Sequence, residues 1–315
     1  MRELHGYLLV ATAAILWGSM GILAKFAYAY GINPPTLIAL RLLTSSLTTL
    51  LLAFMLKRDA FKIQKAHITQ FILFGVFAVA LQRIAYFYAV QLTTVTIAVI
   101  LFYTYPIFVT IYGHKSIGEK VSAPTIIAIP LTFMGVALVV RAYETSWINA
   151  NLPGIIAGLA SSILFVQYFI QAKEFRKHYT NWTLMIYGDT IGALILTPIT
   201  FTSINKIVNY PLELWLIILT IAWVPSLLAY LLYSYAIKHA EYSKGSILGV
   251  LEPLSAAVLS TIILKESLTA PQIIGMIMAL TGVTLPFLQT KQTSKLKVKF
   301  LLQRNFPDVP HALSL

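Results

Sequence analysis

Residues 86–140 read YFYAVQLTTVTIAVILFYTYPIFVTIYGHKSIGEKVSAPTIIAIPLTFMGVALVV, and residues 233–287 read YSYAIKHAEYSKGSILGVLEPLSAAVLSTIILKESLTAPQIIGMIMALTGVTLPF. These stretches are copies of one unit, because they share 14 of 55 residues when aligned without gaps at an offset of 147. A weaker match at an offset of 148 extends the repeat toward the beginning of each half. The identical pairs include Tyr86/Tyr233, Tyr88/Tyr235, Ala89/Ala236, Pro106/Pro253, Glu119/Glu266, Pro124/Pro271 and Gly135/Gly282.

The apolar content of the chain indicates an all-α integral membrane protein. Hydrophobic residues make up 58% of it and charged residues 11%, whereas soluble domains average about 45–50% and about 25%. A helix that crosses roughly 30 Å of hydrocarbon needs about 20 mostly apolar residues. Ten transmembrane helices are predicted near Gly6–Ala29, Pro35–Leu56, Thr69–Val90, Val95–Tyr112, Pro124–Val140, Pro153–Ile170, Trp182–Phe201, Leu212–Ile237, Ser246–Leu264 and Pro271–Leu288.

The lysines and arginines assign an orientation to these spans. With the amino terminus inside, 17 of the 23 fall in cytoplasmic segments, three in outside loops and three within spans. This split follows the positive-inside rule and predicts an even number of spans with both termini cytoplasmic. Topology then accounts for the net charge of +12, so the expected partner is the lipid bilayer and not a nucleic acid.

The repeat and the spans together predict an inverted duplication. Each half contains five helices, an odd number, so the second half has the opposite orientation in the membrane. The predicted units are two five-helix repeats at residues 1–147 and 148–290, followed by a basic cytoplasmic tail at residues 291–315. Inverted repeats are common in secondary transporters, which bind substrate near the membrane midplane between the halves. We therefore expect a transporter that works by alternating access, as a monomer or a homodimer.

A set of short motifs, duplicated in the same order, resembles a known family. The motifs are Leu16-Trp17-Gly18-Ser19, Arg41, Tyr88-Ala89, Thr94-Val95-Thr96, Pro106, Gly118-Glu119-Lys120 and Gly135, then Ala236, Pro253, Lys265-Glu266-Ser267 and Gly282. Over residues 6–288 the chain resembles the EamA-type transporters of the drug/metabolite transporter superfamily. The resemblance implies ten helices, of which helices 1–4 and 6–9 surround a central cavity, and export or exchange of a small metabolite such as an amino acid. We expect a location in the prokaryotic cytoplasmic (inner) membrane.

Arg83 is the residue most expected to bind substrate, since a charge inside the bilayer is costly and usually functional. Gln82 and Tyr86 lie close to it along the same helix. The equivalent helix of the second half carries the polar and aromatic residues Trp223, Ser226, Tyr230 and Tyr233. Facing each other, the two helices would bind an anionic group through Arg83 and stack a flat or apolar body. An ion pair with Asp189 or Glu252, or a snorkelling side chain, is the alternative role for Arg83.

The other charged residues expected within the membrane are candidates for ion coupling or ion pairing. Arg41 and Asp189 occupy equivalent places in the two halves, so Arg41 is the first expected partner of Asp189. Glu252 precedes Pro253, and proline leaves a carbonyl of the preceding turn without its helical donor. Beside such a bend Glu252 could take up a proton or bind an ammonium group, with a purely structural role as the alternative.

Two further residues are candidates for lining the cavity. Trp17 is predicted in the middle of the first span, away from the interfacial belt where tryptophan usually anchors a helix. It either lines the cavity or packs beside a close helix contact that Gly18 permits. Gln167 on the sixth span is also expected to reach the cavity. The second half departs from the first with Phe165-Val166 in place of Trp17-Gly18.

Enzyme classes find no support in the sequence. The chain has no cysteine and no HExxH or GxSxG motif, and we expect neither a metal nor another cofactor. The expected partner is a small-molecule substrate, an amino acid or a related solute. A phosphorylated or nucleotide-type metabolite exchanger and a channel-like facilitator are the alternatives.

Overall fold

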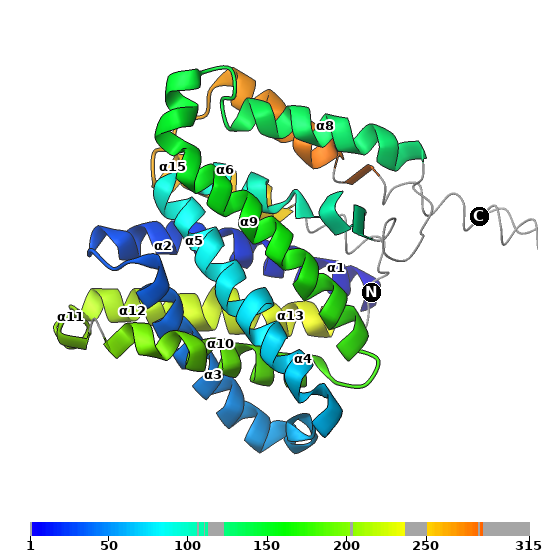
Figure 1. The fold of residues 1–315 in the computed structure, drawn as a ribbon, viewed down its shortest axis with the longest axis vertical. Helices are drawn as coiled ribbons and strands as arrows, with labels where there is room; N and C mark the ends of the chain where they lie inside the picture. The colour runs from blue at the N-terminus through cyan, green and yellow to red at the C-terminus, as the bar shows by residue number, and fades with distance from the viewer. Residues whose placement is uncertain are drawn as a thin grey trace, which may run out of the picture.

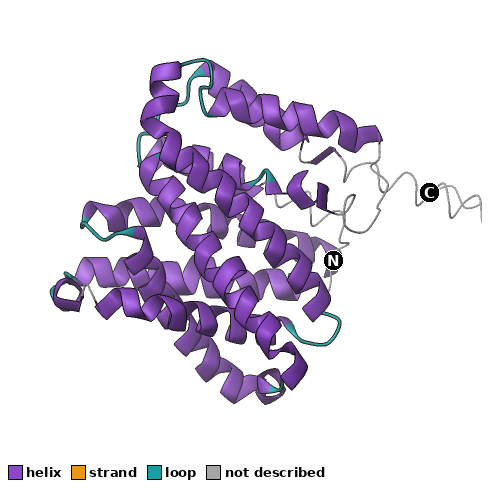
Figure 2. Cartoon of the chain, in the orientation of Figure 1, coloured by secondary structure: helices purple, strands orange, loops and turns teal. Residues whose placement is uncertain are grey.

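The structure is a computed structural model that describes residues 2–105, 107–109, 111–112, 123–201, 204–236, 251–282 and 284–285. Within these ranges the chain forms helices joined by loops and contains no strand (Figure 2). The all-α class predicted from the sequence is therefore confirmed. The predicted tail at residues 291–315 lies outside the described residues.

The helices of the first half follow the predicted spans. They are α1 (Arg2–Gly18), α2 (Met20–Ala29), α3 (Pro34–Leu56), η1 (Arg58–Phe61), η2 (Lys65–His67), α4 (Ile68–Leu73), η3 (Phe74–Leu81), α5 (Gln82–Leu92), α6 (Val95–Phe102) and α8 (Ala123–Val139). Two of their starts are fixed by side-chain caps. The Asn33 side chain accepts a hydrogen bond from the Thr36 N–H at 2.9 Å before α3, and Thr94 accepts one from the Ile97 N–H at 3.2 Å before α6.

The second half repeats this order of elements. Its helices are α9 (Thr145–Phe175), α10 (Asn181–Phe201), α11 (Ile204–Val208), α12 (Leu212–Ala222), η4 (Trp223–Leu228), α13 (Ala229–Ala236), α15 (Leu251–Ile263) and a last helix at Ala270–Gly282. One boundary differs from the prediction, because α9 begins at Thr145 and contains Pro153. Pro153 is the ninth residue of α9 and therefore lies inside the helix, where it removes one backbone hydrogen bond and does not mark the helix start.

Six helical segments are long and apolar enough to cross a membrane. They are His5–Ala29, Pro34–Leu56, Lys65–Leu92, Asn151–Ala172, Asn181–Thr200 and Leu212–Tyr233. Four shorter apolar helices lie at the other predicted spans, at Val95–Val109, Ile126–Val139, Leu251–Ile263 and Ala270–Gly282. The long and the short apolar helices carry many exposed large hydrophobic side chains, such as Leu47 and Leu51 on α3, as a lipid-facing surface requires. The chain is a multi-pass membrane protein.

The packing of the helices is symmetric under exchange of the two halves. In the first half α5 and α6 pack against α9, and in the second half their counterparts α13 and α15 pack against α1. The second helix of each half packs against the other, as α3 against α10. Each half therefore contributes its first helix to the other half's third and fourth helices. Figure 1 shows this exchange, with α9 crossing from the edge of the molecule to lie beside α5.

The same symmetry holds at single residues between α8 and the helix at Ala270–Gly282, which lie side by side in Figure 1. A Cβ added at Gly135 would meet the Gly275 carbonyl oxygen at 2.6 Å. A Cβ added at the equivalent Gly282 would meet the Ala128 carbonyl oxygen at 2.9 Å. Glycine at both positions lets the two backbones approach closely, as small residues do between membrane helices.

The third helix of each half is interrupted by one π-helical segment. These segments are η3 and η4, which end at Leu81 and Leu228, two positions related by the repeat offset of 147. A π-helix has one more residue per hydrogen-bonded turn than an α-helix and is often found at functional sites. Gln82, Arg83 and Tyr86 follow η3, and Tyr230 and Tyr233 follow η4; these five are among the residues that the sequence nominated for substrate binding.

Candidate functional site

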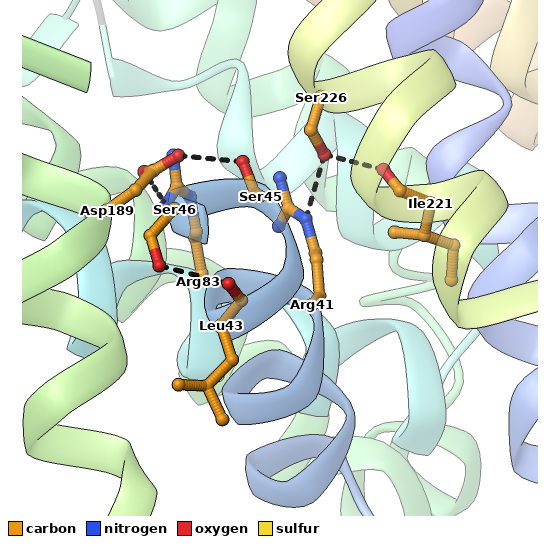
Figure 3. Close-up of polar contacts among 8 residues, drawn as sticks. All are labelled: Arg41, Leu43, Ser45, Ser46, Arg83, Asp189, Ile221 and Ser226. Atoms are coloured by element: carbon orange, nitrogen blue, oxygen red, sulfur yellow. Dashed lines mark hydrogen bonds and ion pairs between the residues drawn. The ribbon is translucent and has the colours of Figure 1, made fainter. Parts of the chain in front are cut away.

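An ion pair joins the third span to the seventh in the interior of the molecule. The Arg83 Nη1 group of α5 donates to Asp189 Oδ1 of α10 at 2.7 Å. The second carboxylate oxygen of Asp189 accepts a hydrogen bond from the Ser45 hydroxyl of α3 at 3.1 Å. Asp189 is buried, whereas the Arg83 side chain keeps 23% of its surface exposed. Figure 3 shows these groups as one connected cluster.

Arg41 of α3 lies beside this cluster but has a different partner. Its Nε–H donates to the Ser226 hydroxyl at 2.9 Å, and that hydroxyl donates to the Ile221 carbonyl oxygen at 2.6 Å (Figure 3). Ile221 lies five residues before Ser226, so the hydroxyl bonds a carbonyl of α12 just before the π-helical segment. The changed backbone register of η4 thus places Ser226 where it accepts a hydrogen bond from the guanidinium.

These contacts decide between the alternatives for ion pairing. The expectation that Arg41 is the first partner of Asp189 is wrong, because the carboxylate pairs with Arg83. The ion pair that the sequence offered as an alternative role for Arg83 is confirmed, with Asp189 and not Glu252 as the partner. A role for Arg83 as a substrate ligand stays a prediction. Arg41 also interacts electrostatically with both members of the pair.

Glu252 belongs to an aromatic environment. Its carboxyl group accepts a hydrogen bond from the Tyr103 hydroxyl at 2.9 Å, between α15 and the end of α6. It also interacts electrostatically with Tyr86 and Tyr105. Tyr86 is buried, as is its neighbour Gln82. The hydrogen bond of the Glu252 carboxyl group is thus to an aromatic side chain, and no ion pair joins it to an arginine in the part of the chain that the structure describes.

The close helix contact predicted beside Trp17 is present. The Trp17 ring contacts the ring of Tyr233, with centroids 5.3 Å apart. Its neighbour Gly18 packs against α15, where an added Cβ would lie 2.8 Å from the Glu252 carbonyl oxygen. The first span therefore approaches the eighth through an aromatic pair and the ninth through glycine. Whether Trp17 touches substrate stays a prediction.

The predicted polar and aromatic stripe on the eighth span does not point in one direction. Trp223 is 46% exposed, and its indole N–H donates to the Thr48 hydroxyl of α3 at 3.1 Å. The Tyr230 hydroxyl donates to the Asn181 carbonyl oxygen at the start of α10 at 3.4 Å. The stripe is predicted from α-helical spacing, but η4 is π-helical. Its different spacing turns Trp223 and Tyr230 in different directions. Gln167 is half-buried on α9.

The sequence did not predict an aromatic column between the third and sixth spans. Phe71 stacks on Phe175 with ring centroids 4.2 Å apart. Phe74 contacts Tyr168 at 5.1 Å, and Tyr168 stacks on Phe165 at 4.9 Å. The only sequence signal was the spacing of three residues between Phe71 and Phe74 and between Phe165 and Tyr168, which puts each pair on one helix face. Ser45 was missed as well, since serine in an apolar helix carries no distinctive signal.

Comparison with known proteins shows which family the chain resembles. The model of the EamA-like transporter family matches residues 4–141 and 152–288, once in each half of the chain. A crystal structure of another protein superposes with a TM-score of 0.62 at 15% identity, covering 91% of this chain and 98% of that one. At that identity the likeness shows the fold alone.

Several relatives are named as transporters. An uncharacterized transporter from Archaeoglobus fulgidus is 32% identical over 200 residues, which is 63% of this chain and 69% of the relative. The uncharacterized transporter YetK of Bacillus subtilis is 26% identical over 92% of this chain and 89% of its own length. The uncharacterized inner membrane transporter YicL of Salmonella typhimurium is 23% identical over 92% of this chain and 97% of its own length.

Proposed function

This chain belongs to the EamA-like transporter family, and from that premise we propose that it is a secondary transporter that moves a small organic metabolite by alternating access. It crosses a prokaryotic cytoplasmic membrane with ten helices, and both termini are cytoplasmic. The substrate is an amino acid or a related solute, and transport is efflux or exchange. The charged side chains in the interior, those of Arg83, Asp189 and Glu252, support a substrate-binding site between the two halves.

One observation carries this proposal, namely the exchange of first helices between the halves. The packing forms two equivalent bundles, one of α5, α6 and α9, the other of α13, α15 and α1. Two equivalent bundles that face each other in opposite orientations can rock about the site between them and open it to either side in turn. The Glu252–Tyr103 bond joins α15 of one bundle to the end of α6 of the other, and the Arg83–Asp189 ion pair joins α5 of the first bundle to α10. Charged groups inside a membrane protein often mark transport pathways.

The proposed substrate contacts are those nominated from the sequence. We propose that Arg83, Gln82 and Tyr86 on α5 contact the substrate, together with Trp17, Gln167, Trp223, Tyr230 and Tyr233. Glu252 and Asp189 are the proposed sites of ion coupling, because they are carboxyl groups well inside the predicted spans, whereas Glu213 lies at the start of one.

Uptake into proteoliposomes tests the proposal. The purified protein is supplied with labelled amino acids, nucleosides and organic acids, with and without an imposed pH gradient. Saturable uptake that shows counterflow would support a carrier, because counterflow requires a site that reopens loaded with substrate. Uptake that does not saturate would support a channel-like facilitator. Stimulation by the gradient would support proton coupling.

The proposed orientation is tested with single cysteines, for which the chain is suited because it contains none. Lys62→Cys in the loop after α3 should react with a membrane-impermeant maleimide only from the cytoplasmic side. Asn209→Cys in the loop after α11 should react only from outside. Both side chains are exposed, so labelling of both from the same side would contradict the predicted topology.

A further inference from the structure

Arg41 is a buried cation with an unused hydrogen-bond donor. The residue is only 4% exposed. Its Nε–H is bonded to Ser226, but its Nη1 group is buried and has no hydrogen-bond partner among the described residues. Ser226 has given its single proton to Ile221, so its hydroxyl acts purely as an acceptor toward Arg41. The guanidinium is therefore held in place and incompletely satisfied.

The charges around Arg41 do not balance. Asp189 neutralises Arg83 through their direct ion pair, while Arg41 takes part in none of the ion pairs within the described ranges. Glu252 directs its carboxyl group to Tyr103 instead. The cluster of Arg41, Arg83 and Asp189 thus carries one excess positive charge in the interior.

An excess buried charge is unfavourable unless an anion meets it. Most buried ionisable groups can escape by changing protonation state, but arginine stays charged in proteins. Inside a membrane the penalty is larger, because water is largely absent. Arg41 has no direct anionic partner among the ion pairs of the described residues, and a transported solute can supply one.

We infer that Arg41 binds the anionic group of the substrate, and that this group is a single carboxylate. The inference rests on the proposed transport function and specifies the substrate class for that site. One carboxylate has the charge that balances the cluster, whereas a phosphate monoester would leave it negative. A planar guanidinium with free N–H groups also suits the planar carboxylate.

The surroundings of Arg41 favour an apolar body for the carboxylate. The Arg41 Cζ atom lies 5.8 Å from the centroid of the Phe87 ring, and that ring contacts the buried Tyr86 at 5.6 Å. Aromatic faces beside a cation accept flat or apolar groups and also attract the guanidinium. The substrate class is thus a small carboxylate with an aliphatic or aromatic body.

Matched pairs of solutes test this inference in proteoliposomes. The probes are leucine and leucinamide, phenylalanine and phenylalaninamide, phenylacetate and phenylacetamide, with glycerol phosphate as the phosphate monoester. The variants are Arg41→Gln and Arg41→Lys, with Arg176→Gln as the matched control, because Arg176 is exposed at the end of α9. Thermal unfolding of each purified protein is measured alongside.

We expect wild type to take up at least one carboxylate and to reject its amide. Arg41→Gln should lower the apparent affinity for that carboxylate by roughly tenfold or more, while Arg41→Lys retains part of it and Arg176→Gln retains all of it. The unfolding midpoint of Arg41→Gln should equal or exceed that of wild type, because the substitution removes an unbalanced buried charge.

Several results would overturn the inference. They are equal uptake of amide and carboxylate, an unchanged KM in Arg41→Gln, and an unfolding midpoint of Arg41→Gln well below that of wild type, which would mark the guanidinium as structural. Saturable uptake of glycerol phosphate or a neutral solute in place of the carboxylates would overturn it while leaving the transporter proposal intact. Absence of saturable uptake for every solute in both panels would count against the transporter itself.

Discussion

Removing the charge of Asp189 while keeping its shape should destabilise the protein strongly. In Asp189→Asn the 2.7 Å ion pair with Arg83 is lost, and two guanidinium groups face each other without an acid between them. Breaking a buried ion pair on one side costs about 3–5 kcal/mol. Arg83 retains 23% exposure and can turn toward water, so we expect a loss near the lower end, about 3 kcal/mol.

The assay is a denaturant or thermal unfolding titration in mixed micelles, followed by circular dichroism. Arg83→Gln and the double variant Arg83→Gln/Asp189→Asn complete a cycle, in which the double variant should be more stable than the sum of the single losses by roughly 1–3 kcal/mol. Lys62→Gln is the control, since it breaks an ion pair with Asp59 on an exposed loop and should leave the unfolding midpoint unchanged. If Asp189→Asn unfolds like Lys62→Gln, the ion pair does not stabilise the fold.

Three other substitutions have expected outcomes. Gly135→Leu should force α8 away from the helix at residues 270–282 and lower stability by about 1–3 kcal/mol, visible as a lower thermal midpoint. Tyr179→Phe keeps the aromatic packing but removes the 2.7 Å hydrogen bond with His67. We expect a stability loss of about 1 kcal/mol and faster cleavage of the loop after α3 in limited trypsin digestion. Ser226→Ala leaves the Nε–H of Arg41 unpaired, so unfolding should be easier by about 1–3 kcal/mol; unchanged stability would mean that another group or water replaces the hydroxyl.

The helical class and its repeat could be predicted because the physical constraints on them are local. An apolar segment in lipid must satisfy its backbone groups within itself, so composition alone selects helices. The duplicated positions Gly135 and Gly282 likewise carried a readable signal, and the structure shows their mirrored contacts. Such features need no knowledge of how one helix is rotated against another.

The partners within the interior could not be predicted in the same way. Arg41 and Asp189 are equivalent in the repeat, but pairing depends on which helix faces each group, and α5 brings Arg83 to the carboxylate. The direction of Trp223 depended on a π-helical turn. One additional residue in a turn rotates the side chains before that turn relative to those after it. No residue type in this stretch predicts the π-helical turn.

The shared end point of the two π-helical segments also bears on how the protein arose. Leu81 and Leu228 close these segments at matching positions, so the simplest history places the extra residue in a single ancestral five-helix unit, before its gene was duplicated. Under the inverted topology predicted from the sequence, that ancestor would have inserted in both orientations and paired with its own inverted copy. After fusion each copy was free to change alone, which accounts for an arginine directly beyond the π-helix in one half, at Arg83, and a tyrosine in the other, at Tyr230.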